Sequence, residues 1–169
     1  MKKTMLAAAA LLSLCFVARA NDTAVTPSVR VVVTFENPEK FTDVKDSQTG
    51  TEKGRDHYLK EIRTLVEEEA SHLLPEGRKL TLTFTDIDLA GDYLPSMPLG
   101  RDVRVMKDIY MPRMKFTFTI TDAAGAVVKE GSERLTDMNY LQTAGIVNRG
   151  EPLFYDKAML RDWLRRSLR

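Results

Sequence analysis

Three aspartates near the middle of the chain could supply oxygen ligands to a calcium ion. Asp86 and Asp88 are separated by one residue, and Asp92 follows after a short gap. Carboxylate oxygens are the ligands that this hard cation prefers. A calcium loop starting at Asp86 would need an oxygen ligand at its fifth position and a glutamate at its twelfth. Ala90 and Met97 occupy those positions, so we expect no metal ion here.

The alternative is a strand end whose carboxylates bond to backbone amides or pair with nearby cations. Arg101 and Arg104 follow the three aspartates in a segment where both signs of charge are crowded. We interpret this segment first as a solvated loop with mutually paired charges, since exposed ion pairs are common and weak. The second interpretation is a polar binding surface, in which the three aspartates and both arginines are candidate binding residues.

A second polar cluster follows the last predicted strand. Asp137, Asn139 and Tyr140 bring a carboxylate, an amide and a phenol close together along the chain. These groups could orient a polar ligand, and we keep all three as candidate binding residues. They could also form a structural corner, in which Asp137 and Asn139 accept hydrogen bonds from turn amides.

No catalytic motif is present in the sequence. The chain has no Gly-x-Ser-x-Gly turn, Walker loop or His-Glu-x-x-His pair. Its only histidines, His57 and His72, lie at opposite ends of a predicted helix and cannot act together. The enzymatic alternative is a metal-dependent or carboxylate-based hydrolase that uses Asp86, Asp88 and Asp137. That hypothesis requires the three carboxylates to meet in one pocket.

Two methionines could offer thioether ligands to Cu(I), which is a soft cation. Met111 and Met114 have the required close spacing. Met114, however, belongs to a predicted inward-facing strand row, and methionine commonly fills irregular gaps beneath loops. We therefore expect packing rather than copper binding, and we assign no metal or cofactor to the chain.

Four strands are predicted to position these side chains. In the first three segments apolar residues recur at every second position, and the fourth follows a predicted hairpin turn. The segments are residues 29–35, 80–89, 114–121 and 126–135. In the second, the apolar phase changes near Thr85 and Asp86, which indicates a β-bulge. Residues 122–125 have the composition of a hairpin turn.

Two helices are predicted around the strands. Residues 58–74 carry apolar side chains at three- and four-residue spacing, with Asp56 placed to cap the helix start. Apolar residues with a similar spacing, including Trp163, predict a C-terminal helix that Asp156 could cap. The polar segment 42–55 reads as a mobile loop, and residues 91–111 read as irregular apart from a short strand at 103–105.

This order of elements, β-α-β-β-β-α, predicts the α+β class. We expect a single domain with a mostly antiparallel sheet packed against two helices. Threonines alternate with the apolar residues on the predicted strands. That pattern is typical of a sheet with one buried and one solvated face.

The first 20 residues have the features of a cleavable signal peptide. Lys2 and Lys3 form a positive start, residues 5–17 are apolar, and residues 18–20 read Ala-Arg-Ala before Asn21. The apolar run is too short for a permanent membrane span, which needs about 20 residues. We expect a signal peptide at 1–20, a polar leader at 21–28 and the domain at 29–169, located in the periplasm.

Signal cleavage would change the composition of the protein. It removes the single cysteine, so the mature chain has neither a disulfide nor a thiol nucleophile. It also removes three of the 25 Lys and Arg residues and none of the 24 Asp and Glu residues, which leaves 22 basic and 24 acidic side chains. A general nucleic-acid binder would need a clear basic excess, so that class is excluded.

The predicted C-terminal helix carries a cationic face, with Lys157, Arg161, Arg165 and Arg166 among its charges. A basic amphipathic helix can lie on an anionic membrane. Cations in the last turn also offset the helix dipole, and Trp163 suits the core. We therefore expect the second role and no membrane contact.

Five segments together resemble a known family. They are Asn37–Asp43, Thr85–Gly91, Asp102–Asp108, Leu135–Tyr140 and Tyr155–Leu160. The chain resembles, over nearly all of residues 29–164, a family of small exported proteobacterial proteins catalogued as a domain of unknown function. The resemblance implies a Gram-negative periplasmic location. It implies no activity, cofactor or catalytic residue.

Taken together, these features favour a non-enzymatic binding module of the cell envelope. The partner would be an envelope protein or a polar ligand, bound through the loop at Gly91–Pro112 and the corner at Asp137–Tyr140. Long irregular segments in compact domains are usually functional or disordered, which is the reason for choosing this loop.

Overall fold

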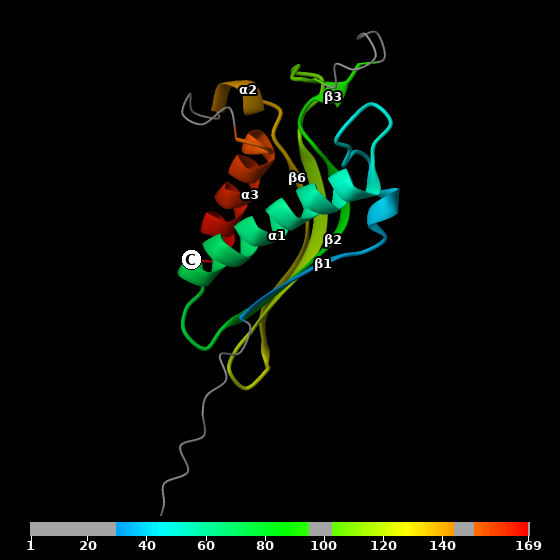
Figure 1. Ribbon diagram of the computed structural model, residues 1–169. Helices are drawn as coiled ribbons and strands as arrows, with labels where there is room; N and C mark the ends of the chain where they lie inside the picture. The colour runs from blue at the N-terminus through cyan, green and yellow to red at the C-terminus, as the bar shows by residue number, and fades with distance from the viewer. Residues whose placement is uncertain (1–29, 95–102, 144–150, 169) are drawn as a thin grey trace, which may run out of the picture.

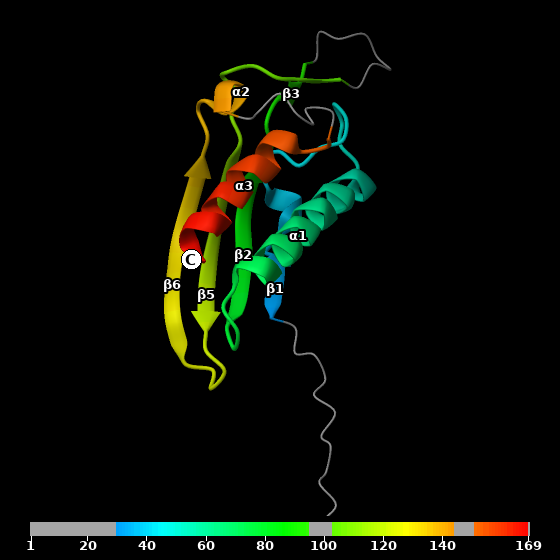
Figure 2. The ribbon, with the colours of Figure 1, turned by 90° about the vertical axis from the view of Figure 1, so that its left-hand side faces the viewer.

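The computed structural model describes residues 30–94, 103–143 and 151–168, and its main feature is a four-stranded sheet with two helices on one face (Figures 1 and 2). The strand order is β1-β2-β5-β6. The strands are β1 (Val31–Phe35), β2 (Lys79–Asp88), β5 (Arg113–Thr121) and β6 (Val127–Thr136), and the covering helices are α1 (Glu52–Leu73) and α3 (Phe154–Ser167). The predicted α+β fold is confirmed.

The direction of each strand follows from its connection. β1 and β2 are parallel, because the segment between them contains α1 and such a helical crossover brings the chain back in the same direction. β2 and β5 pair antiparallel, and β5 turns directly into antiparallel β6 through the predicted hairpin at 122–125. Gly125 takes the left-handed backbone that this turn requires, with φ at 84°. The sheet is therefore mixed, with one parallel pair at its edge.

The core lies between the sheet and the two helices. Leu80, Leu82 and Phe84 of β2 are fully buried in it. Trp163 of α3 packs edge-on against two rings of β5, at 4.7 Å between centroids from Phe116 and 5.3 Å from Phe118. Aromatic pairs at these separations add stability beyond the area that they bury. Trp163 is thus a core residue, as predicted.

The two helices are also joined by a buried cation. Lys157 of α3 donates to Glu61 of α1 at 3.0 Å and to Glu151 at 2.9 Å. Burial alone would lower the pKa of Lys157, but bonding to the two carboxylates raises it above its ordinary value. The amine therefore stays charged and fixes α3 against α1.

The predicted bulge in β2 is confirmed. The pairing register between β2 and β5 shifts between Phe84 and Asp86. The extra residue changes which face later side chains occupy. Asp86 and Asp88 consequently stand beside Lys115 and Arg113 of β5, whereas Ile87 enters the core.

Both predicted helix starts were wrong. α1 begins at Glu52, and its cap is Thr51, whose side chain accepts a bond from the Gly54 amide. Thr51 is held in turn by Asp46, which accepts its amide at 2.9 Å, so this part of segment 42–55 is anchored. α3 begins at Phe154, which places Asp156 inside the first turn, where it does not act as the cap.

Small elements gather at one end of the sheet (Figures 1 and 2). A two-residue ribbon pairs β3 (Asp92–Tyr93) with β4 (Arg104–Val105), which corresponds to the short strand predicted at 103–105. The sequence did not predict α2 (Tyr140–Thr143) or the 3-10 helix η1 (Pro38–Lys40). No helix among the described residues is long and apolar enough to cross a membrane. The predicted signal peptide lies outside those residues and stays a prediction.

Candidate functional site

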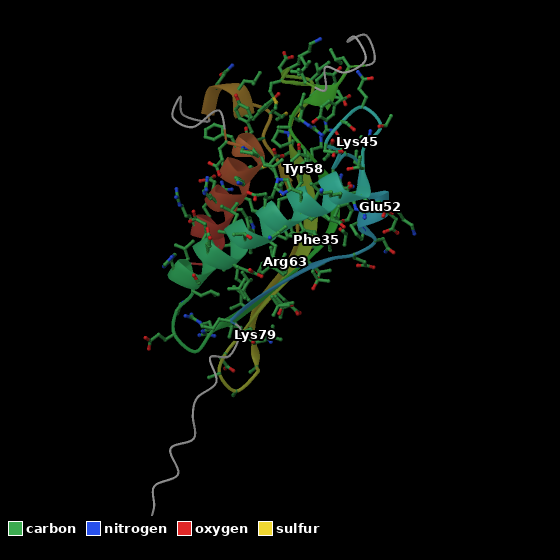
Figure 3. All side chains as sticks on the ribbon, in the orientation of Figure 1. Phe35, Lys45, Glu52, Tyr58, Arg63 and Lys79 are labelled. Atoms are coloured by element: carbon green, nitrogen blue, oxygen red, sulfur yellow. The ribbon has the colours of Figure 1, made fainter. Side chains whose placement is uncertain are left out.

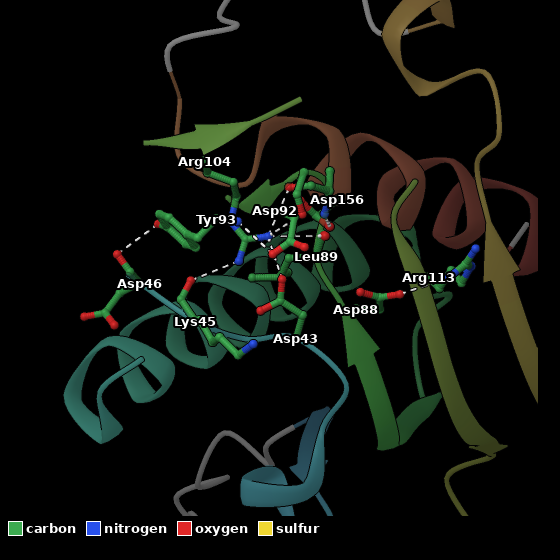
Figure 4. Close-up of polar contacts among 12 residues, drawn as sticks. Asp43, Lys45, Asp46, Asp88, Leu89, Asp92, Tyr93, Arg104, Arg113 and Asp156 are labelled. Atoms are coloured by element: carbon green, nitrogen blue, oxygen red, sulfur yellow. Dashed lines mark hydrogen bonds and ion pairs between the residues drawn. The ribbon is translucent and has the colours of Figure 1, made fainter. Parts of the chain in front are cut away.

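Arg104 joins three separate segments at this end of the molecule (Figure 4). Its guanidinium donates to the Asp43 carboxylate at 3.0 Å and to the Gly91 carbonyl at 2.8 Å. A further bond of 3.0 Å reaches the carbonyl of Lys45, and the carbonyls of Leu89 and Ala90 lie at 3.4 and 3.3 Å. One side chain of β4 thus holds the loop before α1 against the end of β2.

The Arg104–Asp43 pair is largely removed from solvent. Burial alone would lower the pKa of Arg104, but the charge of Asp43 raises it above its ordinary value. The ring of Tyr93 covers the guanidinium at 4.9 Å from its centroid. Within the described structure, Asp43 Oδ1 and Arg104 Nε are buried without a hydrogen-bond partner. Such a pair is costly to break, because either partner alone would be a buried, uncompensated charge.

Gly91 makes the close approach of β4 possible. Its φ of 79° lies in the left-handed region, which residues with a Cβ rarely adopt. A Cβ at this position would stand 2.6 Å from the sulfur of Met106 and 3.0 Å from the Val105 carbonyl oxygen. Gly91 also donates its amide to the Tyr110 carbonyl at 2.9 Å. The glycine therefore lets both sides of the 91–112 loop lie against each other.

Asp156 is buried next to this network. Its carboxylate accepts the Ala90 amide at 3.0 Å, so the first turn of α3 is bonded to the end of β2. The side chain is only 2% exposed, and burial raises its pKa to about 7, although Arg104 partly offsets this. The sequence suggested a helix cap here, whereas the structure has a buried acid that titrates near neutrality.

The predicted binding aspartates do not form one cluster. The Asp86 carboxylate accepts hydrogen bonds from the Lys115 amine at 2.7 Å and from the Thr42 amide at 2.9 Å. Burial alone would raise its pKa, but these bonds hold it below its ordinary value. Asp88 pairs with Arg113 at 3.2 Å, and burial nonetheless raises its pKa. Asp92 accepts the amide of the next residue, Tyr93, at 2.7 Å.

These bonds correspond to the structural alternative for the three aspartates. No group of three acidic or histidine side chains among the described residues could hold a metal ion. Arg104 is paired with Asp43 rather than with any of the three. Arg101 lies outside the described residues.

The predicted corner at 137–140 is attached to the 91–112 loop. Asp137 accepts the Asn139 amide at 3.0 Å, which is the turn geometry expected for a structural corner. The Asp137 amide lies 3.4 Å from the Pro112 carbonyl. Tyr140 is fully buried, packs on Tyr155 at 4.8 Å, and donates its hydroxyl to the Lys107 carbonyl at 2.7 Å. Tyr140 is therefore an anchor for the loop.

The hydrolase hypothesis requires Asp86, Asp88 and Asp137 to share a pocket. Among the described residues, Asp88 and Asp92 line a cleft of about 210 Å³ with Asp43 and Tyr110. Asp137 instead lines a different hollow, between the end of β6 and α3. The three carboxylates are not brought together, so the geometry that this hypothesis needs is missing.

Residues 103–112 of the predicted loop and the corner carry exposed apolar side chains, whereas residues 95–102 of that loop lie outside the described residues. Val103 is 52% exposed, Met106 40%, Ile109 63% and Met138 72%. We call these four residues the tip surface. They lie on two segments that are bonded to each other through Tyr140 with Lys107 and through Asp137 with Pro112. Exposed apolar side chains that gather on one surface are typical of an interaction site. Among the described residues, the other large exposed apolar side chains are those of Val127 and Val128, which follow the hairpin at the opposite end of the sheet.

Sequence reasoning missed several of these residues. Asp43 lies in a polar stretch with no motif, and its pairing with Arg104 joins positions far apart in the chain. Tyr93 and Asp156 likewise depend on long-range contacts. Met106 and Ile109 are large apolar residues in a segment without strand or helix periodicity, which draws attention to them but does not tell whether they are exposed.

Comparison with protein families finds a match that covers most of the chain. Residues 29–166 match the family described as Protein of unknown function (DUF3016). The chain belongs to this family, as its resemblance predicted. Searches of curated proteins and of solved structures find no match.

Proposed function

We propose that this family member is an exported, non-enzymatic binding protein of the cell envelope, and that its tip surface contacts another envelope protein. The observation that carries the proposal is the exposure of Val103, Met106, Ile109 and Met138 on an anchored loop and corner. Interface cores are enriched in methionine and aromatic residues and depleted in charge. The tip surface has the methionines of such a core, and exposed Lys107 and Asp108, which lie between Met106 and Ile109, would belong to its polar rim.

Anchoring of the loop supports this role. Arg104 bonds to two segments beneath the loop, the one before α1 and the one after β2, and Tyr140 holds the loop through the Lys107 carbonyl. A surface that is ordered before binding loses less conformational entropy on association. The apolar side chains are thus presented on a preformed support, which favours binding of a folded or extended protein partner.

A macromolecular partner fits better than a small molecule. The cleft beside the loop measures about 210 Å³. Pockets for small ligands usually enclose about 300–1,000 Å³. Its lining mixes charged and apolar residues, and two of the charged ones, Asp88 and Arg113, already pair with each other. Of the tip surface, Ile109 contributes to the cleft lining, whereas Val103, Met106 and Met138 lie outside the cleft, where a protein surface can reach them.

The proposed location rests on the N-terminal sequence. Positive residues, an apolar run and an Ala-x-Ala site together are typical of a cleaved export signal. A mature chain without cysteine also keeps the same covalent structure in an oxidising compartment. The partner is then a component of the envelope.

The proposal is tested by photo-crosslinking in cells of the organism that makes the protein. A photoreactive amino acid is placed at Ile109 or Met138 in the full chain, and the cells are irradiated. Both side chains are exposed, so neither change disturbs the core. We expect a discrete adduct with one envelope protein from both positions, detected by gel shift and identified by mass spectrometry.

Val127 provides the matched control, because it is also an exposed apolar residue but lies at the other end of the sheet. It should give no such adduct. An adduct of equal yield from Val127, or none from Ile109 and Met138, would contradict the proposed role of the tip surface.

A further inference from the structure

The outer edge of β1 has no neighbouring strand in the described structure. β1 is the first strand in the sheet order and pairs only with β2. The Arg30 carbonyl accepts the Leu80 amide at 2.8 Å, and the Glu36 amide donates to the Phe84 carbonyl at 2.9 Å, so both groups face β2. Backbone groups alternate in direction along a strand, so those of Val33 and Phe35 point away from the sheet. They are available to an added strand.

A groove runs beside this edge, between β1 and α1. It encloses about 440 Å³ and is lined by Val33, Thr34 and Phe35 of β1, and by Leu59, Lys60 and Arg63 of α1, among others. Arg63 lies over the Phe35 ring at 5.3 Å from its centroid and closes one side (Figure 3). The groove therefore combines free backbone groups with side-chain contacts on the helix.

The two edges of the sheet differ in composition. The outer strand β6 carries Lys129, Glu130, Glu133 and Arg134. Charges of this kind on an edge strand prevent unwanted pairing with another chain. β1 reads Val-Val-Val-Thr-Phe and has no charge. The protein thus protects one edge and leaves the other suited to pairing.

The charge of the groove indicates what kind of segment it would take. Lys60 and Arg63 are exposed, and neither forms an ion pair with any residue in the described part of the chain. Asp56, also in the lining, is paired with Arg55 at 3.1 Å. The α1 side of the groove is therefore positive. An acidic segment would complement it.

We propose that this groove binds an extended acidic segment of another polypeptide, which adds to the sheet as a strand beside β1. Backbone bonds to Val33 and Phe35 would provide affinity, and Lys60 and Arg63 would select acidic side chains. This site lies apart from the tip surface. The inference does not depend on the proposed function there.

The test is a selection from a library of random eight-residue peptides on the purified mature protein. We expect enrichment of peptides in which acidic residues accompany β-branched or aromatic residues. Adding an enriched peptide should slow hydrogen exchange at the amides of Val33 and Phe35 at least about tenfold, because an added strand protects outward-facing amides. Thermal unfolding of each variant confirms that it is folded.

The charge requirement is tested with the double variant Lys60→Glu, Arg63→Glu, in which both changes are at exposed positions. It should weaken binding at least about tenfold, the usual effect of placing like charges across an interface. The matched control, Lys53→Glu with Arg165→Glu, makes the same charge change elsewhere and should leave binding intact. Equal enrichment of acidic peptides on the Lys60→Glu, Arg63→Glu variant and on the control variant would overturn the proposal. So would a dimer with slow exchange at Val33 without peptide, because a second copy would then be the occupant.

Discussion

Replacement of Arg104 by methionine should lower the free energy of unfolding by about 3–5 kcal/mol. The variant leaves Asp43 as a buried carboxylate without its cation and removes the donor that serves the Gly91 and Lys45 carbonyls. Buried groups left unpaired cost far more than the net worth of the bonds that they had formed. Urea unfolding at neutral pH, followed by circular dichroism, measures the change.

Arg113→Met is the matched control for this prediction. Arg113 also pairs with an aspartate, Asp88, but its side chain is 49% exposed. Solvent screens that pair, so we expect a loss below about 1 kcal/mol. Adding Asp43→Asn to the Arg104→Met variant should restore part of the stability, because it removes the unpaired charge. Equal effects of Arg104→Met and Arg113→Met would contradict the importance assigned to the buried pair.

Asp156→Asn should make the protein more stable relative to wild type as the pH rises from about 4 to about 8. Burial raises the pKa of folded Asp156 from 3.8 to about 7. A carboxyl group whose pKa is higher in the folded than in the unfolded protein stabilises the fold fully at a pH below the unfolded pKa. This stabilisation is lost as the pH rises through the folded pKa. A difference of this size corresponds to at most about 4 kcal/mol. Asparagine keeps the acceptor for the Ala90 amide without acquiring a charge.

Asp86→Asn provides a control of opposite sign. Lys115 and Thr42 hold the pKa of Asp86 below its ordinary value, so its contribution is present above about pH 4 and is lost in acid. The Asp86→Asn variant should therefore be less stable than wild type at neutral pH, with the difference shrinking in acid. The free energy of unfolding in urea, measured across the pH range, distinguishes the pH dependence of Asp86→Asn from that of Asp156→Asn. A stability difference between Asp156→Asn and wild type that does not vary with pH would rule out titration of Asp156 in this range.

β1, β2 and β5 were predictable because their apolar residues alternate, and the bulge was predictable because that alternation changes phase at Asp86. β6 was predictable from the hairpin turn before it rather than from alternation. Helix starts were less predictable. Asp56 and Asp156 both have the side chain of a cap, yet Thr51 caps α1 and Asp156 is buried under a long-range bond to Ala90. Local propensity does not report which of several polar residues the tertiary contacts select.

The candidate binding residues had a similar limit. Asp137 and Tyr140 directly follow the last predicted strand, and the structure shows that this corner bonds to Lys107 and Pro112 of the loop. Sequence spacing did not reveal that Arg104 pairs with Asp43, since the two are distant in the chain and neither belongs to a periodic pattern. The exposure of Ile109 and Met138 also required the structure, because an apolar residue in an irregular segment can be buried or exposed.

The most direct test of the binding role is native mass spectrometry of the protein released gently from the envelope of its own cells. We expect a mature chain starting at Asn21, together with a noncovalent protein adduct. The variant Met106→Ser, Ile109→Ser, Met138→Ser should lose that adduct, and Val127→Ser, Val128→Ser should keep it. An adduct that survives in the first variant, or a bound metal ion in place of a protein, would contradict binding through the tip surface.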